Sequence, residues 1–280
     1  RPILIFSDYL NTVMNSSYYR NWCYNVKTDA VNQSNINAQK LSQLMIPIPP
    51  LKEQERIVVE VAKWISLIDT IKNSKEDLQT TIKQAKSKIL NLAIHGKLVP
   101  QDPNDEPAIE LLKRINPDFT PCDNGHYTQL PEGWAICKMK QITSITNGKS
   151  QKNVETLNGI YPIYGSGGVI GRANQYLCIA GSTIIGRKGT INNPIFVEEH
   201  FWNVDTAFGL KANDAILDKY LYYFCLSFDF SKLDKSTAMP SLTKTSIGNV
   251  LIPIPPYKEQ ERIVAKIDMV LDTMNEILRA

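Results

Sequence analysis

The chain has 280 residues, of which 43% are hydrophobic, 21% charged and 9% aromatic. This composition is typical of a folded globular protein, and it excludes collagen-like, silk-like and intrinsically disordered chains. The formal net charge of +3 permits a polyanionic partner without requiring one. No stretch reaches the ~18 to 20 uncharged apolar residues of a membrane-spanning helix, so we expect a soluble protein.

The cysteines and the first residues bear on cellular location. Five scattered cysteines form no Cys-x-x-Cys pair, and only three histidines accompany them. This pattern argues against a disulfide framework and a zinc site, and it favours the reducing cytoplasm. The sequence starts at Arg1 without an initiator Met or a secretory signal pattern, so we expect it to be a piece of a longer chain.

A thirteen-residue motif occurs twice. Residues 46–58 read Ile-Pro-Ile-Pro-Pro-Leu-Lys-Glu-Gln-Glu-Arg-Ile-Val, and residues 252–264 repeat them with Tyr257 in place of Leu51, at an offset of 206 residues. A weaker likeness lies upstream, where Asp8-Tyr-Leu resembles Lys219-Tyr-Leu. An offset this long indicates duplicated domains and not a solenoid.

A long amphipathic helix is predicted after each copy of the motif, because the prolines keep the backbone extended until the motif ends. Apolar residues then recur at alternating steps of four and three, which is the pattern of a coiled-coil seam. The predicted interface residues are Ile57, Val61, Trp64, Ile68, Ile71, Lys75, Leu78, Ile82 and Ile89, followed by Ile263, Ile267, Val270, Met274 and Ile277. A helix of ~40 residues cannot bury such a seam against a compact neighbour, so it needs a second long helix from the distal repeat, a second chain or a partner.

The one polar residue in the first seam is Lys75, which either sets register and partner choice or extends its ammonium group out of the seam. Gly96 is expected to end this helix. A proline-rich connector follows, with a short helix predicted at residues 107–115.

Residues 128–250 show short apolar runs separated by turn residues, which predicts strands. The expected strands are 134–139, 141–146, 161–164, 182–185, 194–197 and 205–210. Helices are expected at 217–228 and at 241–248, the second with Ser241 as its N-cap. The predicted fold class is therefore α+β: a mixed, β-rich domain with a few helices, attached to a long coiled-coil helix and a second, shorter C-terminal helix.

Residues that could carry catalysis do not form a familiar constellation. The glycines of residues 165–171 have the wrong spacing for a dinucleotide loop, and Arg187 stands where a nucleotide-binding P-loop requires lysine. The three histidines have no spacing suited to a triad or to a metal. We therefore expect no catalytic residue, no metal and no cofactor in this chain.

Basic and polar side chains instead gather in the loops of residues 128–250. Arginine can pair with guanine edges, lysine with phosphates, and asparagine or serine with adenine edges. The candidate DNA-binding residues are Lys149, Lys152, Ser166, Arg172, Arg187, Lys188, Thr190, Asn192, Lys235 and Lys244. Residues 186–190 are the strongest candidates because flanking glycines allow close approach, although any single basic residue could simply be solvated surface.

Three motifs together resemble one family: the duplicated motif, residues 92–107 (Leu-Ala-Ile-His-Gly-Lys-Leu-Val-Pro-Gln-Asp-Pro-Asn-Asp-Glu-Pro) and residues 130–134 (Leu-Pro-Glu-Gly-Trp). In these the chain is similar to the specificity (S) subunit of a type I restriction-modification enzyme, over nearly its whole length. The resemblance implies target recognition domains joined by two long antiparallel helices. It assigns 1–50 to the tail of a first target recognition domain, 51–95 to the central helix, 96–127 to a connector, 128–256 to the second target recognition domain and 257–280 to the start of the distal helix.

The resemblance also implies a non-catalytic subunit that recognises half of a bipartite double-stranded DNA site. Two adenine methyltransferase subunits and the restriction (translocase) subunits are the implied partners, with S-adenosylmethionine, ATP and Mg²⁺ bound on those partners. The seam itself suggests a homodimer through the long helices. The alternative function is a coiled-coil scaffold whose globular domain binds protein or saccharide.

Overall fold

The computed structural model describes residues 4–30, 33–123, 127, 129–233 and 241–279. The chain forms two compact units, Arg1–Thr80 and Thr81–Ala280. The division falls inside the long helix α4 (Leu51–Ile94), which begins directly after the prolines of the first motif. No helix of the described residues is long and apolar enough to cross a membrane.

The first unit is mostly helical up to α4. Its elements are α1 (Ser7–Met14), α2 (Ser17–Val26), β1 (Thr28–Ala30), β2 (Gln33–Asn35) and α3 (Ala38–Leu41), with β1 and β2 antiparallel. Tyr9 is buried, and its hydroxyl donates to the carbonyl of Pro47 at 2.8 Å. This bond ties α1 to the proline segment from which α4 starts.

Helix α4 has 44 residues, which corresponds to ~66 Å at ~1.5 Å per residue. All residues from 62 to 81 are exposed, whereas Ile82, Leu90 and Ala93 are buried in the second unit. Gly96 follows the helix with a φ of +67°, a left-handed conformation that favours glycine. The predicted long helix and its end at Gly96 are therefore confirmed.

The second unit is built around three small sheets. Its elements after α4 are α5 (Ala108–Ile115), β3 (Ala135–Lys138), α6 (Met139–Ile142), β4 (Thr143–Asn147), β5 (Tyr161–Gly165), β6 (Gly168–Ala173), β7 (Ser182–Gly186), β8 (Ile195–Val197), β9 (Trp202–Asn203), β10 (Ala207–Ala212), α7 (Asp218–Ser227), the 3-10 helix η1 (Phe230–Leu233), α8 (Lys244–Gly248), β11 (Leu251–Ile254) and α9 (Tyr257–Arg279). The strand orders are β4-β10-β7-β8, β6-β5-β9 and β11-β3. Among the strands that the structure describes in this unit, β5 and β9 alone pair in parallel, so the unit is mixed and β-rich, as the predicted α+β class requires.

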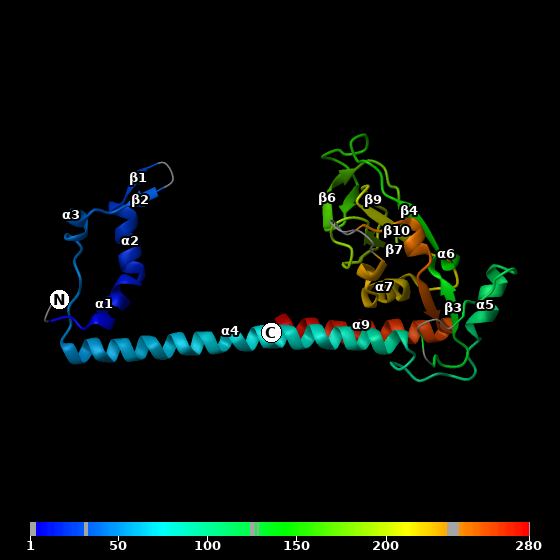
Figure 1. Ribbon diagram of the computed structural model, residues 1–280, viewed down its shortest axis with the longest axis horizontal. Helices are drawn as coiled ribbons and strands as arrows, with labels where there is room; N and C mark the ends of the chain where they lie inside the picture. Colours follow the sequence, from blue (N-terminus) through cyan, green and yellow to red (C-terminus); the bar gives the residue numbers. More distant parts are fainter. Residues whose placement is uncertain (1–3, 31–32, 124–126, 128, 234–240, 280) are drawn as a thin grey trace. The chain divides into compact units, whose positions relative to one another are not determined.

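The largest hydrophobic cluster joins the sheets β4-β10-β7-β8 and β11-β3 to helices of this unit, whereas the sheet β6-β5-β9 contributes to a separate, smaller cluster. Leu90 and Ala93 from the end of α4 lie in the same buried cluster as Ile263 and Ile267 of α9, together with residues of α7. Farther along, Lys86 Nζ donates to Asn275 Oδ1 at 2.9 Å. Because lower numbers on α4 meet higher numbers on α9, the two helices pack antiparallel, and Figure 1 shows α9 alongside the last turns of α4.

Strands β6, β9 and β11 are absent from the sequence-based expectations. The glycines that open β6 mimic a loop, and Pro253 in β11 mimics a break. Proline is tolerated there because β11 pairs with β3 alone and has no second neighbour within its sheet.

The predicted N-cap of α8 was wrong. The cap is Thr243, whose hydroxyl accepts from Ser246 N at 3.0 Å. Ser241 instead forms an isolated β-bridge with Lys188.

Candidate nucleic-acid interface

The candidate interface lies at one end of the strands of the sheet β4-β10-β7-β8, where β4 and β7 end and β10 begins. Asn147, the last residue of β4, lies opposite Phe208, and Gly186, the last residue of β7, lies opposite Ala207. The loops after β4 and β7 therefore leave the sheet on either side of the turn that precedes β10.

The backbone of residues 203–206, here called the central turn, holds three basic residues. Lys149 N donates to the carbonyl of Asn203 at 2.9 Å, and Arg187 N donates to the carbonyl of Thr206 at 2.7 Å. Lys188 N makes a longer bond to the same Thr206 carbonyl at 3.4 Å. Lys149, Arg187 and Lys188 are all exposed, and we call these three residues the basic rim.

Buried side chains fix the central turn. Asn203 is fully buried, and its Nδ2 donates to the carbonyl of Ala207 at 3.2 Å while its Oδ1 accepts from Cys178 Sγ at 3.2 Å. Burial raises the pKa of the Cys178 thiol to about 12, so the thiol keeps its proton at neutral pH. Trp202 Nε1 donates to the carbonyl of Lys149 at 2.9 Å. The basic rim is thus attached to a turn that buried, hydrogen-bonded side chains hold in place.

Two further segments reach the basic rim. A Cβ placed on Gly186 would lie 3.2 Å from Ser166 Cβ, so the tip of the β5–β6 hairpin lies beside the end of β7. Leu242 N donates to the carbonyl of Arg187 at 2.9 Å, which brings the segment before α8 to the same place. Lys244, exposed in the first turn of α8, follows two residues later.

Gly186 itself is required by this geometry. A Cβ there would lie 1.9 Å from the carbonyl oxygen of Thr190, so only glycine lets the chain turn back on itself. Thr190 is exposed at the far side of this turn.

Other candidates from the sequence lie elsewhere. Arg172 is on β6, opposite Pro162 and away from the hairpin tip, and its Nη1 donates to the carbonyl of Ile160 at 3.1 Å. Lys152 is exposed in the turn that follows Lys149. Lys235 lies outside the described residues.

The Asn192 side chain has two structural partners. Its Nδ2 donates to Asp229 Oδ1 at 2.7 Å, and its Oδ1 accepts from Phe230 N at 2.8 Å. These bonds hold the start of η1, so the amide has less capacity for a base.

The central turn was missed by the sequence interpretation. Its residues, Asn-Val-Asp-Thr, are the last residue of β9 and the three residues before β10, and they carry the polar signature of a turn. That signal could have located the turn, but its hydrogen bonds to residues 149 and 187 depend on the sheet register.

The rim's chemistry suits an anionic, hydrogen-bonding ligand. Arg187 Nη1 makes a long contact, at 3.5 Å, with the carbonyl of Asp205, and among the described residues no shorter hydrogen bond holds the guanidinium. Two lysines beside it supply point charges, and Ser166 supplies a hydroxyl. In the part of the chain that the structure describes, no group of three or more His, Cys, Asp or Glu residues could hold a metal ion.

The predicted seam residues differ widely in burial. Those buried are Ile82, Ile263 and Ile267; those half-buried are Ile57, Val61, Ile89, Val270 and Met274; those exposed are Trp64, Ile68, Ile71, Lys75, Leu78 and Ile277. The end of α4 thus has its helical neighbour, whereas its middle presents an apolar stripe to solvent.

Comparison with known protein families identifies the family of this chain. The model of the type I restriction modification DNA specificity domain matches residues 11–80 and 131–280, so the chain belongs to this family. It is similar to the type I restriction enzyme EcoAI specificity subunit of Escherichia coli, with 24% identity over 83% of this chain and 54% of the relative. It is also similar to the EcoKI specificity subunit of Escherichia coli K12, with 24% identity over 95% of this chain and 58% of the relative.

The chain therefore spans little more than half the length of these curated relatives. Among solved structures, one described as the structural basis of complex assembly and conformational transition of the type I R-M system matches with a TM-score of 0.72 at 19% identity, over 97% of this chain and 65% of that one. The HsdS subunit from Thermoanaerobacter tengcongensis matches with a TM-score of 0.59 at 17% identity, over 99% of this chain and 65% of that one. These structures support the fold, and the family match gives no support to the alternative of a protein- or saccharide-binding scaffold.

Proposed function

We propose that this chain is a sequence-specific DNA recognition component of a type I restriction-modification complex and performs no bond chemistry itself. The observation that carries the proposal is the basic rim, in which three exposed cations are fastened to one turn of a DNA specificity domain. Its second unit would read one half of a bipartite site in double-stranded DNA.

The rim residues have distinct expected roles. Lys149 and Lys188 would contact phosphates and set the position of the domain on the duplex. Arg187 would reach a base edge, where a guanidinium can pair with both acceptors of guanine. The buried Asn203 is a positioning residue, because it fixes the turn that carries all three cations.

Catalysis would belong to partner subunits. Two adenine methyltransferase subunits would bind S-adenosylmethionine, and restriction subunits would bind ATP and Mg²⁺ for translocation. The match to a structure titled for type I R-M complex assembly supports partners of this kind. Such a complex would work in the cytoplasm, where the DNA is.

A homodimer through the long helices is the second part of the proposal. The stripe of Trp64, Ile68, Ile71 and Leu78 on α4 is exposed over residues 62–81, and a second long helix is the partner that a heptad seam fits. The stripe is continuous with the part of α4 that already packs against α9.

Selection from a random duplex pool tests the DNA-binding function. The wild-type chain, with and without its methyltransferase partner, should enrich a defined half-site. The double variant Arg187→Ala and Lys188→Ala should lose that enrichment. Lys258→Ala with Lys266→Ala, which removes two exposed lysines of α9, is the control of equal charge and should enrich the same half-site.

Two outcomes would refute this function. One is that the wild type enriches no sequence under either condition. The other is that the rim variant enriches the same sequence as efficiently as the wild type.

A further inference from the structure

The β5–β6 hairpin is fixed to the same turn that holds the basic rim. Val204 N, in the central turn, donates to the carbonyl of Tyr164 on β5 at 2.9 Å. A Cβ placed on Gly165 would lie 3.6 Å from Ile170 Cγ2 and 3.9 Å from Val204 Cγ2, so one point lies within 4 Å of both side chains. The β6 side of the hairpin therefore lies close to the central turn.

A β-bulge places two apolar side chains at this end of β6. Tyr164 lies opposite Val169 and Ile163 lies opposite Gly171, which leaves Ile170 as an extra residue in β6. Bulges bend a strand and redirect its side chains, and they are frequent beside functional sites. Val169 is 58% exposed and Ile170 is 55% exposed. Two neighbouring branched, apolar side chains thus face solvent beside a group of cations.

The hairpin has the shape and charge of an element that enters a DNA groove. It is a two-stranded antiparallel ribbon, which the major groove can admit. A Cβ on Gly167 or Gly168 would meet no atom of the described residues within 4 Å, so the tip projects from the domain. Residues 161–172 include no Asp or Glu that phosphates would repel. The Glu155 carboxylate lies beside Gly171, so its repulsion limits the approach of DNA to the tip and the bulge.

We propose that the β5–β6 hairpin enters the major groove and that Val169 and Ile170 contact the 5-methyl group of a thymine. The inference rests on the proposed DNA-binding function and names one base that the domain reads. The thymine methyl is the apolar group that base edges present in this groove. Its contact with two branched side chains removes apolar surface of both molecules from water.

DNA is the occupant because the apolar pair is continuous with the basic rim. Lys149, Arg187 and Lys188 are bonded to the central turn, to which the hairpin is also bonded. Ser166 at the hairpin tip lies beside the end of β7, directly before Arg187. A duplex whose phosphates meet the rim would therefore present its base edges to the hairpin.

Uracil substitution tests this contact, because deoxyuridine differs from thymidine only in lacking the methyl group. Dissociation constants of the whole chain, with its methyltransferase partner where selection requires it, would be measured for the selected half-site. They would also be measured for duplexes in which one thymine at a time is replaced by uracil. One of these replacements should weaken wild-type binding by about fourfold, the contribution of one methyl group removed from water.

A pair of variants assigns the effect to the hairpin. Val169→Ala with Ile170→Ala should bind the thymine and the uracil duplex equally, and the uracil duplex about as tightly as the wild type does. Leu157→Ala with Ile160→Ala is the matched control. It removes two apolar side chains, 100% and 68% exposed, before the other end of β5, and it should keep the fourfold difference.

The possible failures are distinguishable. If a half-site is selected but no uracil replacement weakens binding, this inference is wrong and the proposed function stands. If Val169→Ala with Ile170→Ala keeps the fourfold difference, another residue reads the methyl and the apolar pair faces something else, such as a protein, which also overturns the inference. If the chain selects no half-site at all, the proposed function fails and this inference fails with it.

Discussion

At the scale of single residues, Gln260 makes three side-chain hydrogen bonds, as its counterpart Gln54 does in the first copy of the repeated motif. Its amide joins the start of α9 to the segment before α7, through one accepted and two donated hydrogen bonds. Replacing both donor and acceptor functions leaves Leu217 N–H and two carbonyls buried without partners. Unsatisfied buried groups of this kind each cost about 1 to 3 kcal/mol.

We therefore expect Gln260→Ala to lower the free energy of unfolding of the second unit by about 3 kcal/mol in urea titrations. Glu261→Ala, at an exposed position on the same helix turn, should change it by less than about 0.5 kcal/mol. If Gln260→Ala lowers the free energy of unfolding as little as Glu261→Ala does, the three hydrogen bonds do not stabilise the second unit.

Glu259 contributes a stability that falls as pH rises, the opposite of what a carboxyl group with a lowered pKa contributes. Burial raises the pKa of its carboxyl above the ordinary value, although the hydrogen bonds from Gln101 and Trp134 and the charge of Arg262 act in the opposite direction. A raised folded-state pKa means that the folded protein holds this proton more tightly than the unfolded chain. The stability contributed by the protonated form is complete below the unfolded-state pKa and is lost as pH rises through the folded-state pKa.

Glu259→Gln removes this titration and keeps the size of the side chain. The free energy of unfolding of the wild type, minus that of Glu259→Gln, should fall as pH rises from about 4 through the raised pKa. Urea titrations at a series of pH values measure the difference, in which the other carboxylates cancel. A difference that rises with pH would mean that the hydrogen bonds lower the pKa of Glu259 more than burial raises it.

At the scale of elements, α4 has two different environments. Its last turns share a core with α9, whereas Ile68 and Ile71, each 61% exposed, belong to a stretch that is exposed throughout. If this stretch is a helix-pairing seam, charge on its apolar face should prevent association.

We expect the wild type to sediment as a dimer at micromolar concentration and Ile68→Glu with Ile71→Glu to sediment as a monomer. Ser66→Glu with Asn73→Glu adds the same charge outside the predicted seam and should leave the dimer intact. A monomeric wild type would contradict the homodimer. Both variants should keep the core of the second unit, which includes Leu90 and Ile263, folded as in the wild type.

The sequence predicted the helices better than the sheets. Heptad spacing and the proline motif act over neighbouring residues, so α4 and α9 could be located from local pattern alone. Strand β11 could not, because Pro253 is acceptable only where β3 is the single neighbour within the sheet. Likewise, Thr243 and not Ser241 caps α8, since Ser241 pairs with Lys188, a residue 53 positions away in the sequence.

The candidate interface was only partly predictable for the same reason. Glycines around residues 186–190 marked the loop that carries Arg187 and Lys188, and the structure ties both residues to the central turn. The sequence around Asn192 does not show that its side chain is bonded within the fold. Its amide bonds to Asp229 and Phe230, which lie almost forty residues away. Whether a polar loop residue faces a ligand or its own fold is decided by contacts distant in sequence.

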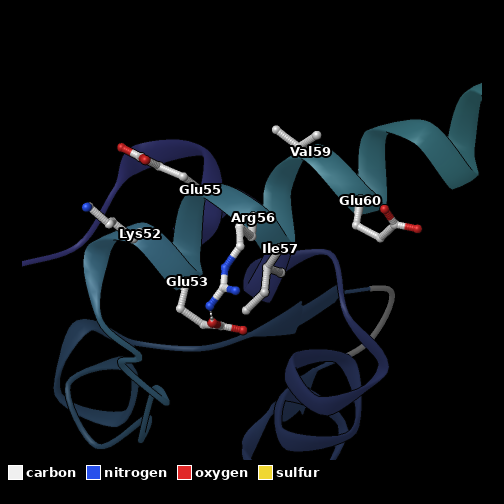
Figure 2. Close-up of a pocket in the computed structure, with 7 residues that line it drawn as sticks. All are labelled: Lys52, Glu53, Glu55, Arg56, Ile57, Val59 and Glu60. Atoms are coloured by element: carbon white, nitrogen blue, oxygen red, sulfur yellow. Dashed lines mark hydrogen bonds and ion pairs between the residues drawn. The ribbon is translucent and has the colours of Figure 1, made fainter.

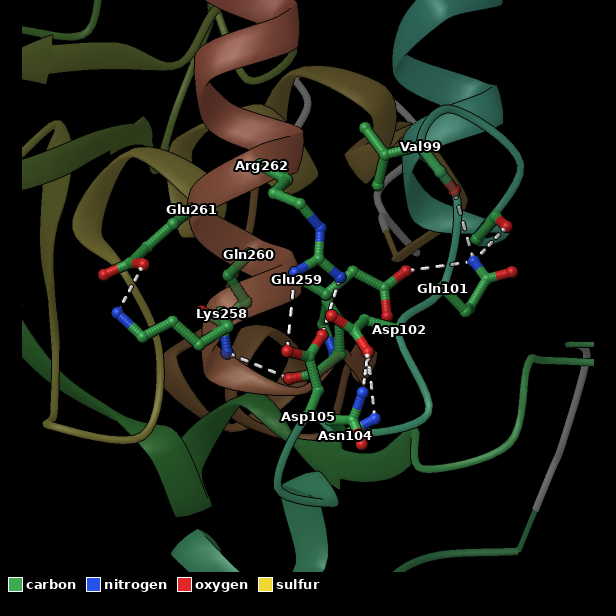
Figure 3. Close-up of polar contacts among 12 residues, drawn as sticks. Val99, Gln101, Asp102, Asn104, Asp105, Lys258, Glu259, Gln260, Glu261 and Arg262 are labelled. Carbon is green, nitrogen blue, oxygen red and sulfur yellow. Dashed lines mark hydrogen bonds and ion pairs between the residues drawn. The ribbon is translucent and has the colours of Figure 1, made fainter.

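At the scale of the whole molecule, the chain carries one motif twice, at the start of α4 (Figure 2) and at the start of α9 (Figure 3), and among the described residues the second copy is paired with β3 and bonded to Trp134 and Gln101. In the second unit the motif is covered, and it anchors a β-rich domain that bears the basic rim. In the first unit, the Glu53 side chain of the motif is 42% exposed, and the helix that follows carries the exposed apolar stripe. The second unit thus carries the exposed basic rim, and the first presents an exposed apolar stripe on α4.

The salt dependence of DNA binding tests the central claim, that the basic rim reads DNA, most directly. Dissociation constants for the selected half-site and for a scrambled duplex would be measured over a salt series for the wild type, Arg187→Ala and Lys188→Ala. Arg187→Ala should reduce discrimination between the duplexes by about 1 to 3 kcal/mol. Lys188→Ala should weaken both complexes alike and reduce the salt slope by about 1. If both variants bind both duplexes with wild-type affinity and slope, the basic rim does not contact DNA and the account is wrong.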